Sequence, residues 1–530
     1  MRRRRVASQR VMTLRRNVAV DGSRRLGRAL ALAVALGVPA AGIEAQQTPP
    51  QFERARALIE RAMREDSLPS ITVAVAKDGR VLWAQGFGYA DLERRIPATP
   101  ETMYSLASIS KPITATALMR LVEQGRIDLD QPANAYLGEA RIHSDVWPAD
   151  GATVRRVLSH SAGLPLHYEF FYDGETHEPR STDEGIARYA VLIAPPGSLY
   201  QYSNLGYGIL DRILELQHGR SYAELMRTEV FEPLGMTHTR IGTGAGLGDA
   251  AAVRYGPDNR PVPYYDFDHR GGSAVYSSAL DLVRFGNFHL GLQRERRARI
   301  LGDQTRRLMQ QPISAGAASD GYGLGWSILA DDHGFRRVSH TGGMPGVSTF
   351  LSLYPEENVV VVVLTNRSNG WTGRIMSELA AAVLPGYRQR LEARLAAEEA
   401  ERSARQTGNG ANAGTTRQTI PAALRGRWSG LVRTPDDTVR LTLDVREDGD
   451  VHVRLGDALE TVLNEVSVPE PDRLVGRFAG TLPDDHAQRH PHNVLLQLVL
   501  RDGRLEGQAS AQTTGWPYWY ALTSPVRLER

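Results

Sequence analysis

The two lysines of the chain are the first residues that indicate chemistry, because 63 positions carry lysine or arginine and only Lys77 and Lys111 are lysines. Arginine stays protonated in proteins, whereas a lysine removed from water can lose its proton near pH 7 and act as a base. Lys77 precedes an Asp-Gly turn, and we interpret it as a solvated surface charge. Lys111 closes a four-residue segment that Ser108 opens, and it is the candidate base.

Helical spacing would bring Ser108 and Lys111 together. Residues 112–119 have the apolar periodicity of a helix, and residues three apart share a helix face. If Ser108 opens this helix, the amine reaches the hydroxyl, and the helix N-terminus favours the anion that forms on attack. The spacing therefore favours a serine nucleophile with a lysine base, and the alternative is an N-cap serine followed by an exposed lysine.

Two further motifs favour the catalytic interpretation. Tyr202 and Asn204 flank Ser203, and they offer a phenol for proton transfer and an amide for substrate binding. A His-Thr-Gly-Gly segment at residues 340–343 precedes two expected strands, residues 349–354 and 359–364. Each motif is weak alone, and their presence in one chain favours a serine hydrolase.

With these three motifs the sequence resembles the serine β-lactamase and penicillin-binding protein superfamily, in particular its class C β-lactamase, DD-peptidase, D-aminopeptidase and family VIII esterase branch. The resemblance implies an α/β (α+β) fold, with an antiparallel sheet, flanking helices and a helical insert, and it implies no metal or organic cofactor. It covers residues 52–384 and includes Tyr104 to Lys111, Leu158 to Pro165, Phe231 to Met236, Gly321 to Trp326 and Leu364 to Asn366.

The resemblance also implies roles for the first two motifs. Ser108 would be the acylated nucleophile, with Lys111 and Tyr202 as the proton-transfer pair. Asn204 would bind the amide carbonyl of the substrate. Because Ser203 stands between Tyr202 and Asn204, where class A enzymes have a Ser-Asp-Asn motif, their glutamate-assisted deacylation should not be transferred to this chain.

For the third motif, the resemblance implies that His340, Thr341 and Gly342 lie on the strand beside the active site. The backbone N–H groups of Gly343 and Ser108 would form the oxyanion hole. Many β-lactamases have a lysine where this chain has His340, and a histidine supplies less fixed positive charge for a substrate carboxylate at pH 7. This difference weakens the case for an efficient β-lactamase.

These observations predict an exported serine hydrolase that cleaves amide or ester bonds through an acyl-Ser108 intermediate, with D-amino-acid peptides or small esters as substrates. The alternatives are a β-lactamase or DD-carboxypeptidase, and a penicillin-binding sensor or scaffold with little turnover. The expected partner is a small molecule or short peptide, with cell-wall fragments among the candidates. The oligomeric state is not predicted.

The patterning indicates four regions. Residues 50–390 combine strands at both ends, including strand character at Tyr322 to Leu329, with a helical middle, which predicts the hydrolase domain. An Ala/Glu/Arg helix and a small-polar linker follow at residues 391–418. Alternating apolar and polar residues in the segment 419–530 predict an all-β domain, which loosely resembles the lipocalin-like barrels of D-aminopeptidase relatives.

The N-terminal residues 1–45 form the fourth region and contain ten arginines, followed by a short apolar run and small residues. These are the parts of an export signal, so we expect a periplasmic or extracellular protein with no stable membrane span after cleavage. Without this leader the net charge falls from +3 to −5, which gives no electrostatic case for binding nucleic acid.

Several other residues have two interpretations. His160 is expected to be structural, although it could be mistaken for a triad histidine, and Tyr104 either lines the entrance or packs inside. We expect core packing, rather than a binding face, for the aromatic segment Trp516 to Tyr520. A loop is favoured over a metal site for the polar cluster of Asp484, Asp485, His486, His490 and His492.

Overall fold

The structure is a computed structural model that describes residues 48–530, except 177–178, 293–299, 316–319 and 409–419. The predicted leader and most of the predicted linker lie outside these residues. Residues 48–530 form one compact unit, and the predicted domain boundaries stay predictions. Among the described helices, none has the length and apolar character needed to cross a bilayer.

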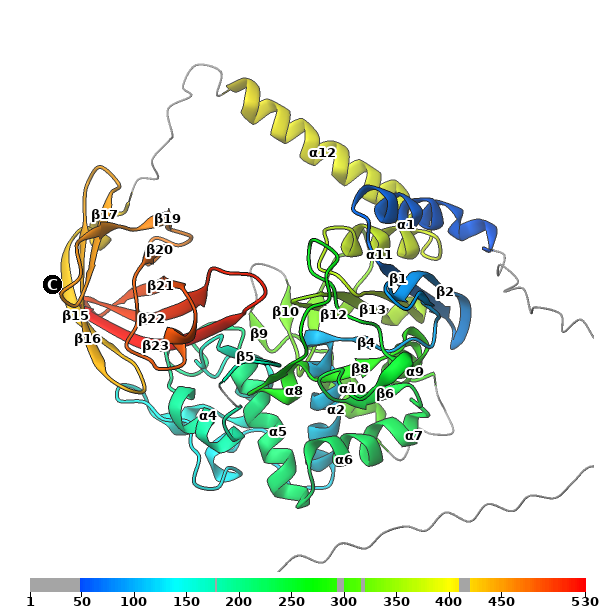
Figure 1. Ribbon diagram of the computed structural model, residues 1–530, viewed down its shortest axis with the longest axis horizontal. Helices are drawn as coiled ribbons and strands as arrows, with labels where there is room; N and C mark the ends of the chain where they lie inside the picture. Colours follow the sequence, from blue (N-terminus) through cyan, green and yellow to red (C-terminus); the bar gives the residue numbers. More distant parts are fainter. Residues whose placement is uncertain (1–47, 177–178, 293–299, 316–319, 409–419) are drawn as a thin grey trace, which may run out of the picture. The chain divides into compact units, whose positions relative to one another are not determined.

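An antiparallel nine-stranded sheet forms the centre of the N-terminal region, in the order β3-β2-β1-β14-β13-β12-β11-β10-β9 (Figure 1). Strand β14, between β1 and β13, has the sequence VVVVVLT and is buried on both faces, which explains its continuous apolar run. The strands are β1 (Ser70–Lys77), β2 (Arg80–Asp91), β3 (Ile96–Pro97), β9 (Ser314–Ala315), β10 (Gly321–Tyr322), β11 (Ser327–Leu329), β12 (Arg337–Met344), β13 (Val347–Tyr354) and β14 (Val359–Thr365).

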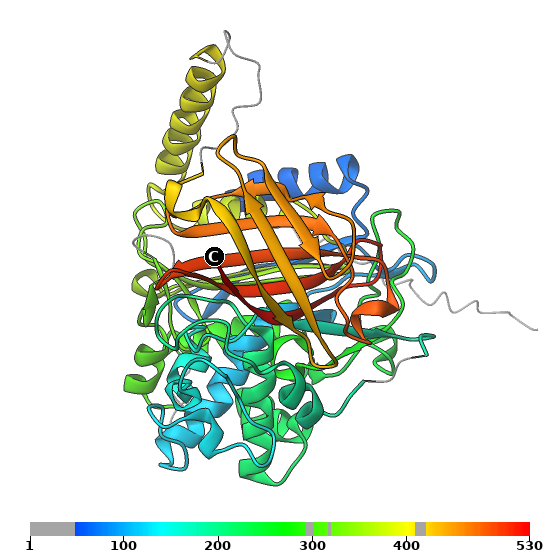
Figure 2. The same cartoon turned by 90° about the vertical axis from the view of Figure 1, so that its left-hand side faces the viewer.

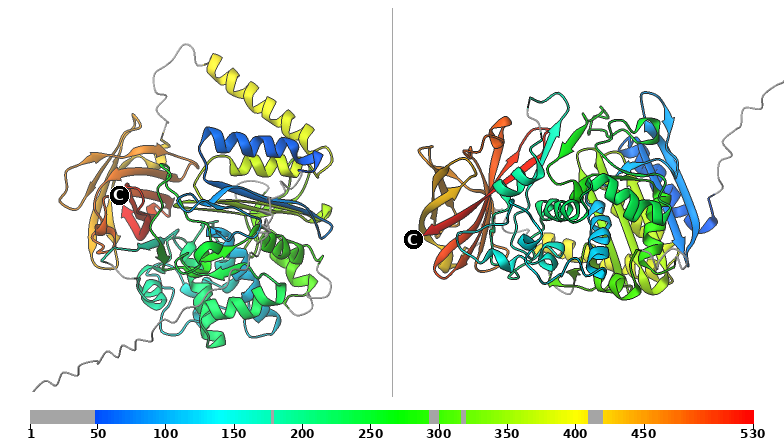
Figure 3. Two further views of the ribbon diagram at one scale, coloured as in Figure 1. Left: turned by 45° about the vertical axis from the view of Figure 1, so that its right-hand side comes forward. Right: turned by 90° about the horizontal axis from the view of Figure 1, so that it is seen from below.

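Helices cover both faces of this sheet (Figure 3). Val361 and Val363 of β14 pack in one cluster with α1 (Glu53–Glu65) and α11 (Thr372–Ala381). The alternate residues Val360 and Val362 pack with the helical insert on the opposite face. The insert contains α2 (Ser110–Glu123), α3 (Val154–Leu158), α4 (Thr182–Tyr189), α5 (Asn204–His218), α6 (Tyr222–Met226), α7 (Glu232–Leu234), α8 (Arg270–Ser273), α9 (Ala279–His289) and α10 (Asp303–Met309).

Six short or peripheral elements complete this region. The small sheet β4-β8-β6 borders the insert, β5 pairs with β7, and α12 follows α11. Their bounds are β4 (Tyr104–Ser105), β5 (Tyr168–Tyr172), β6 (Thr239–Ile241), β7 (Tyr265–Phe267), β8 (Val275–Ser277) and α12 (Tyr387–Gly408).

The C-terminal strands form a nearly closed, barrel-like antiparallel sheet, which confirms the predicted all-β fold (Figure 2). Its order is β18-β17-β16-β15-β23-β22-β21-β20-β19, and β5 of the N-terminal region pairs with the first residues of β23. The strands are β15 (Gly426–Arg433), β16 (Thr438–Val445), β17 (Val451–Leu455), β18 (Thr461–Val462), β19 (Asn464–Ser467), β20 (Arg473–Ala479), β21 (His492–Arg501), β22 (Arg504–Thr513) and β23 (Tyr520–Glu529).

The structure adds detail to one expectation and corrects another. The strand character predicted from Tyr322 to Leu329 takes the form of a hairpin, because Gly325 adopts a φ of +90° and reverses the chain between β10 and β11. Core packing fails for Trp516 and Trp519, which are 44% and 37% exposed, since their segment connects β22 to β23 outside the barrel.

Gly286 tests how tightly α9 packs on the sheet. A Cβ there would lie 2.7 Å from Cγ1 of Val360, whereas a Cβ at Gly185 of α4 meets no atom within 4 Å. We expect Gly286→Ala to lower the free energy of unfolding, because overpacking costs about 1–3 kcal/mol and alanine returns about 1 kcal/mol of helix propensity. Gly185→Ala should raise it by about 0.5–1 kcal/mol. Urea unfolding measures both, and equal shifts would contradict this packing.

Candidate active site

Ser108 lies in a 3₁₀ turn, η2 (Ala107–Ile109), that leads directly into α2. The preceding Ala107 has a φ of +48°, a left-handed conformation that is costly for a residue with a Cβ. The sheet holds this turn in place, because the Thr349 hydroxyl of β13 donates to the Leu106 carbonyl at 2.9 Å. The strained backbone thus presents the serine at the junction of helix and sheet.

Gly342 lets β12 approach this turn. A Cβ at position 342 would lie 2.0 Å from the Leu106 carbonyl oxygen, so only glycine fits. Strand β11 pairs with β12 only as far as Ser339. In the described part of the chain, no strand is paired with the η2-facing edge of β12 beyond that point, and Thr341 and Gly343 are exposed there. Their backbone groups are open to a substrate beside Ser108.

Lys111 is fully buried and contacts three oxygens. Its Nζ lies 3.2 Å from Ser108 Oγ, 2.7 Å from Asn204 Oδ1 and 3.1 Å from the Gly272 carbonyl oxygen. No carboxylate of the described residues lies within salt-bridge distance of it. Burial therefore lowers the pKa of Lys111 well below its usual value.

The three contacts are also compatible with a neutral amine. In that form two N–H groups donate to Asn204 and Gly272, and the lone pair faces the hydroxyl of Ser108. A neutral Lys111 would then be placed to act as a base for the serine.

Tyr202 lies on the other side of this pair. Its ring centroid is 4.8 Å from Lys111 Nζ, and its hydroxyl is hydrogen-bonded to Ser108. Burial raises the pKa of Tyr202, and the hydrogen bond to Ser108 only partly offsets that rise. The phenol is therefore protonated at neutral pH and able to donate.

His160 positions the Tyr202 segment. Its Nδ1 accepts the Ser203 N–H at 3.1 Å, its carbonyl accepts the Gln201 N–H at 2.7 Å, and its ring lies 4.3 Å from that of Tyr202. Burial lowers the pKa of His160 well below its usual value. The structural role expected for His160 is thus to fix the backbone beside the nucleophile.

Asn204 begins α5, with Ser203 as its N-cap: the Ser203 hydroxyl accepts the Gly206 N–H at 2.9 Å. The Asn204 backbone N–H donates to the Leu166 carbonyl at 2.9 Å. These contacts leave the amide side chain of Asn204 directed at Lys111.

Several contacts that were not predicted from the sequence hold α8 close to Lys111. The Gly271 N–H donates to Asp211 at 2.5 Å, and the Thr114 hydroxyl of α2 donates to the Gly271 carbonyl at 2.6 Å. A Cβ at Gly271 would lie 2.5 Å from the Tyr207 carbonyl. The Gly-Gly pair at residues 271–272 is the feature of the sequence that could have indicated these contacts, because glycine permits such a close approach of two backbones.

His340 is neutral in this site. Its Nδ1–H donates to the Thr341 carbonyl at 2.7 Å, which leaves Nε2 to accept the Tyr322 hydroxyl at 2.9 Å. Burial lowers the pKa of His340 to about 3. The side chain supplies no fixed positive charge for a substrate carboxylate.

A family model described as Beta-lactamase matches residues 55–384. The chain belongs to the Beta-lactamase family. Penicillin-binding protein 4* of Bacillus subtilis is 28% identical over 56% of this chain and 68% of its own length. Protein flp of Staphylococcus aureus (strain MRSA252) is 24% identical over 62% of this chain, which spans 65% of that relative.

Solved structures of this family share the fold. SurE superposes with a TM-score of 0.58 at 20% identity, over 89% of this chain and 99% of its own. A class C β-lactamase gives 0.54 at 19% identity, over 62% of this chain and 96% of its own. EstCE1, described as a hydrolase with promiscuous acyltransferase activity, gives 0.51 at 25% identity, over 63% of this chain and 98% of its own. The superfamily resemblance of the sequence is thereby confirmed.

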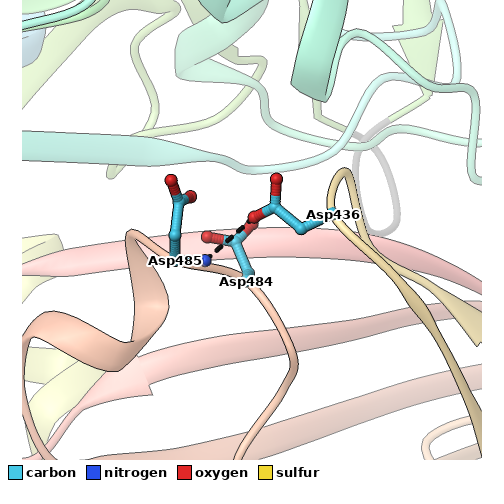
Figure 4. A group of neighbouring side chains, drawn as sticks. All are labelled: Asp436, Asp484 and Asp485. Carbon is cyan, nitrogen blue, oxygen red and sulfur yellow. Dashed lines mark hydrogen bonds between the residues drawn. The ribbon is translucent and has the colours of Figure 1, made fainter.

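The remaining candidates lie elsewhere. Tyr104 packs inside, with its hydroxyl 2.9 Å from those of Thr72 and Ser70. Figure 4 shows Asp436, Asp484 and Asp485 together, where the Asp485 N–H donates to Asp436 at 2.9 Å. Their oxygens are already used by hydrolase residues: Arg188 binds Asp436 and Asp485, Arg180 binds Asp485, and Tyr189 binds Asp484.

The lowered pKa of Lys111 predicts a pH-dependent stability. Between its lowered folded pKa and its unfolded pKa, the unfolded state binds a proton that the folded state lacks. The folded protein should therefore gain up to about 1.4 kcal/mol per pH unit as pH rises from 7 towards 10, relative to Lys111→Met. Urea unfolding of both proteins across this range measures the difference. Parallel curves would show that Lys111 is charged when folded.

Proposed function

We propose that this chain is an exported serine hydrolase that is acylated on Ser108 and acts on D-amino-acid peptides or small esters without a carboxylate beside the reacting bond. The observation that carries the proposal is the desolvated Lys111 amine, 3.2 Å from Ser108 Oγ and without a carboxylate partner among the described residues. A neutral base at this distance can activate a serine at neutral pH.

The chemistry follows from the positions of the protons. Ser108 Oγ attacks the substrate carbonyl carbon while its proton passes to Lys111 Nζ, and the N–H groups of Ser108 and Gly343 bind the oxyanion. Asn204 binds the substrate amide, and Tyr202 passes the proton to the departing nitrogen or oxygen. Water then hydrolyses the acyl-enzyme and regenerates Ser108.

The neutral His340 favours peptides and esters over β-lactams. An anionic β-lactam gains little from an uncharged imidazole, whereas a neutral ester needs no countercharge. Among structures with this fold, one is SurE with D-Leu and another is the hydrolase EstCE1. The D-amino acid of the first and the hydrolase activity of the second support an amide or ester substrate, and the arginine-rich leader supports export.

Intact-mass spectrometry tests the nucleophile. We expect wild-type protein to hydrolyse a p-nitrophenyl ester and Ser108→Ala to fall to the background rate, because no other described hydroxyl has Lys111 as base. A persistent adduct with a fluorescent penicillin, absent in Ser108→Ala, would favour the penicillin-binding sensor instead. If neither reagent reacts through Ser108, the hydrolase proposal is wrong.

The pH dependence of the selectivity between a neutral ester and a penicillin tests the role of His340. With a pKa of about 3, its side chain stays neutral from about pH 5 to pH 9. The ratio of kcat/KM for a neutral ester to the acylation rate by a penicillin should therefore not titrate near pH 6.5. A ratio that falls below pH 6.5 and becomes flat in His340→Gln would show instead a charged histidine that binds carboxylates.

A further inference from the structure

The segment of residues 166–169 connects the active site to the C-terminal domain. At one end, the Leu166 carbonyl accepts the backbone N–H of Asn204 at 2.9 Å. At the other end, Glu169 is 1% exposed and its backbone N–H donates to Asp268 at 3.2 Å. A displacement of this short segment would be passed directly to Asn204, which holds the Lys111 amine.

Asp268 ties this segment to α8. Its carboxylate binds His167 on one side and His269 Nδ1 on the other, at 2.5 Å, and all three side chains are buried. Burial lowers the pKa of His167, but the attraction and hydrogen bond of Asp268, together with the charges of Glu169 and Asp484, raise it above its usual value. His269 directly precedes α8, whose Gly272 carbonyl accepts from Lys111. The same segment therefore controls two acceptors of the base.

The carboxylate of Glu169 is held from the C-terminal domain. Its Oε1 lies 2.5 Å from His486 Nδ1 and 2.8 Å from an Arg489 guanidinium nitrogen. Arg489 is 3% exposed and its guanidinium stacks 5.1 Å from the ring of Phe171. Tyr520 of β23 and Glu169 of β5 are also partners in strand pairing, which holds the backbone of Glu169 beside the C-terminal strands.

The buried charge of Glu169 makes its contacts with His486 and Arg489 necessary for an ordered structure around it. A buried carboxylate without partners is strongly unfavourable, and in the described residues both side-chain partners of Glu169 come from the loop of residues 484–490. Exposed ion pairs between the same two regions, such as Arg433 with Asp145, carry no such constraint.

We propose that Glu169 is a positioning residue, and that the docked loop 484–490 sets the geometry of Asn204 and Lys111. The C-terminal domain thus serves the chemical step and not substrate capture. The kinetic effect that we expect rests on the proposed acylation of Ser108. The structural effect that we expect rests on the contacts of Glu169 alone.

The test compares full-length Glu169→Gln and Arg489→Lys with Arg433→Gln, which removes the exposed pair at the same interface. We expect Glu169→Gln to lower kcat for a p-nitrophenyl ester by about 100-fold, with KM changed less than about 3-fold, because misplaced catalytic groups cost the chemical step. Hydrogen exchange of residues 200–206 should accelerate in Glu169→Gln, and Arg433→Gln should match wild type in both measurements.

Each failure has a separate meaning. Wild-type protein without Ser108-dependent activity would refute the proposed function, while exchange at residues 200–206 would still decide the positioning role. The inference is wrong if Glu169→Gln has the hydrogen exchange and the kcat of the wild type, or if only its KM rises. If Glu169→Gln does not fold, Arg489→Lys decides by the same criteria, because it keeps the charge and loses the paired geometry.

Discussion

The site depends on one constraint, the removal of the Lys111 amine from water with no carboxylate of the described residues to neutralise it. An ammonium group in this position would lose its hydration and gain amide and hydroxyl dipoles and the faces of two tyrosine rings, but no full countercharge among these residues. The neutral amine is the form that the surroundings favour, and it has one lone pair beside Ser108. The catalytic base is thus produced by burial rather than by a neighbouring charge.

The fold keeps this amine buried by bringing distant segments to it. Asn204 begins α5 and Gly272 belongs to α8, while Ser108 precedes α2 on a strained turn that β13 holds through Thr349. Gly342 allows β12 to close the remaining side. Each acceptor of the lysine therefore comes from a separate element, and the base is assembled only when the insert packs on the sheet.

Sequence reasoning could predict the parts that local patterns encode. The scarcity of lysine identified Lys111, and the valine run identified β14. It could not predict β5, because its pairing with β23 joins residues more than 300 positions apart. The neutral state of His340 was equally hidden, since it depends on burial and on the Tyr322 hydroxyl rather than on residue type.

The polar residues of the C-terminal loop show the same limit. A cluster of aspartates and histidines between two strands indicates only a loop, and nothing in the sequence pairs His486 with Glu169 across the chain. The long-range contacts give these residues their role in the structure.

NMR of protein labelled with ¹³C at lysine Cε tests the central claim most directly, because the chain has only two lysines and Lys111→Met assigns the signals. The account predicts that the Lys111 signal has the shift of a neutral amine at pH 7 and that Ser108→Ala leaves it neutral. A Lys111 signal that stays that of an ammonium group up to about pH 10 would contradict the account.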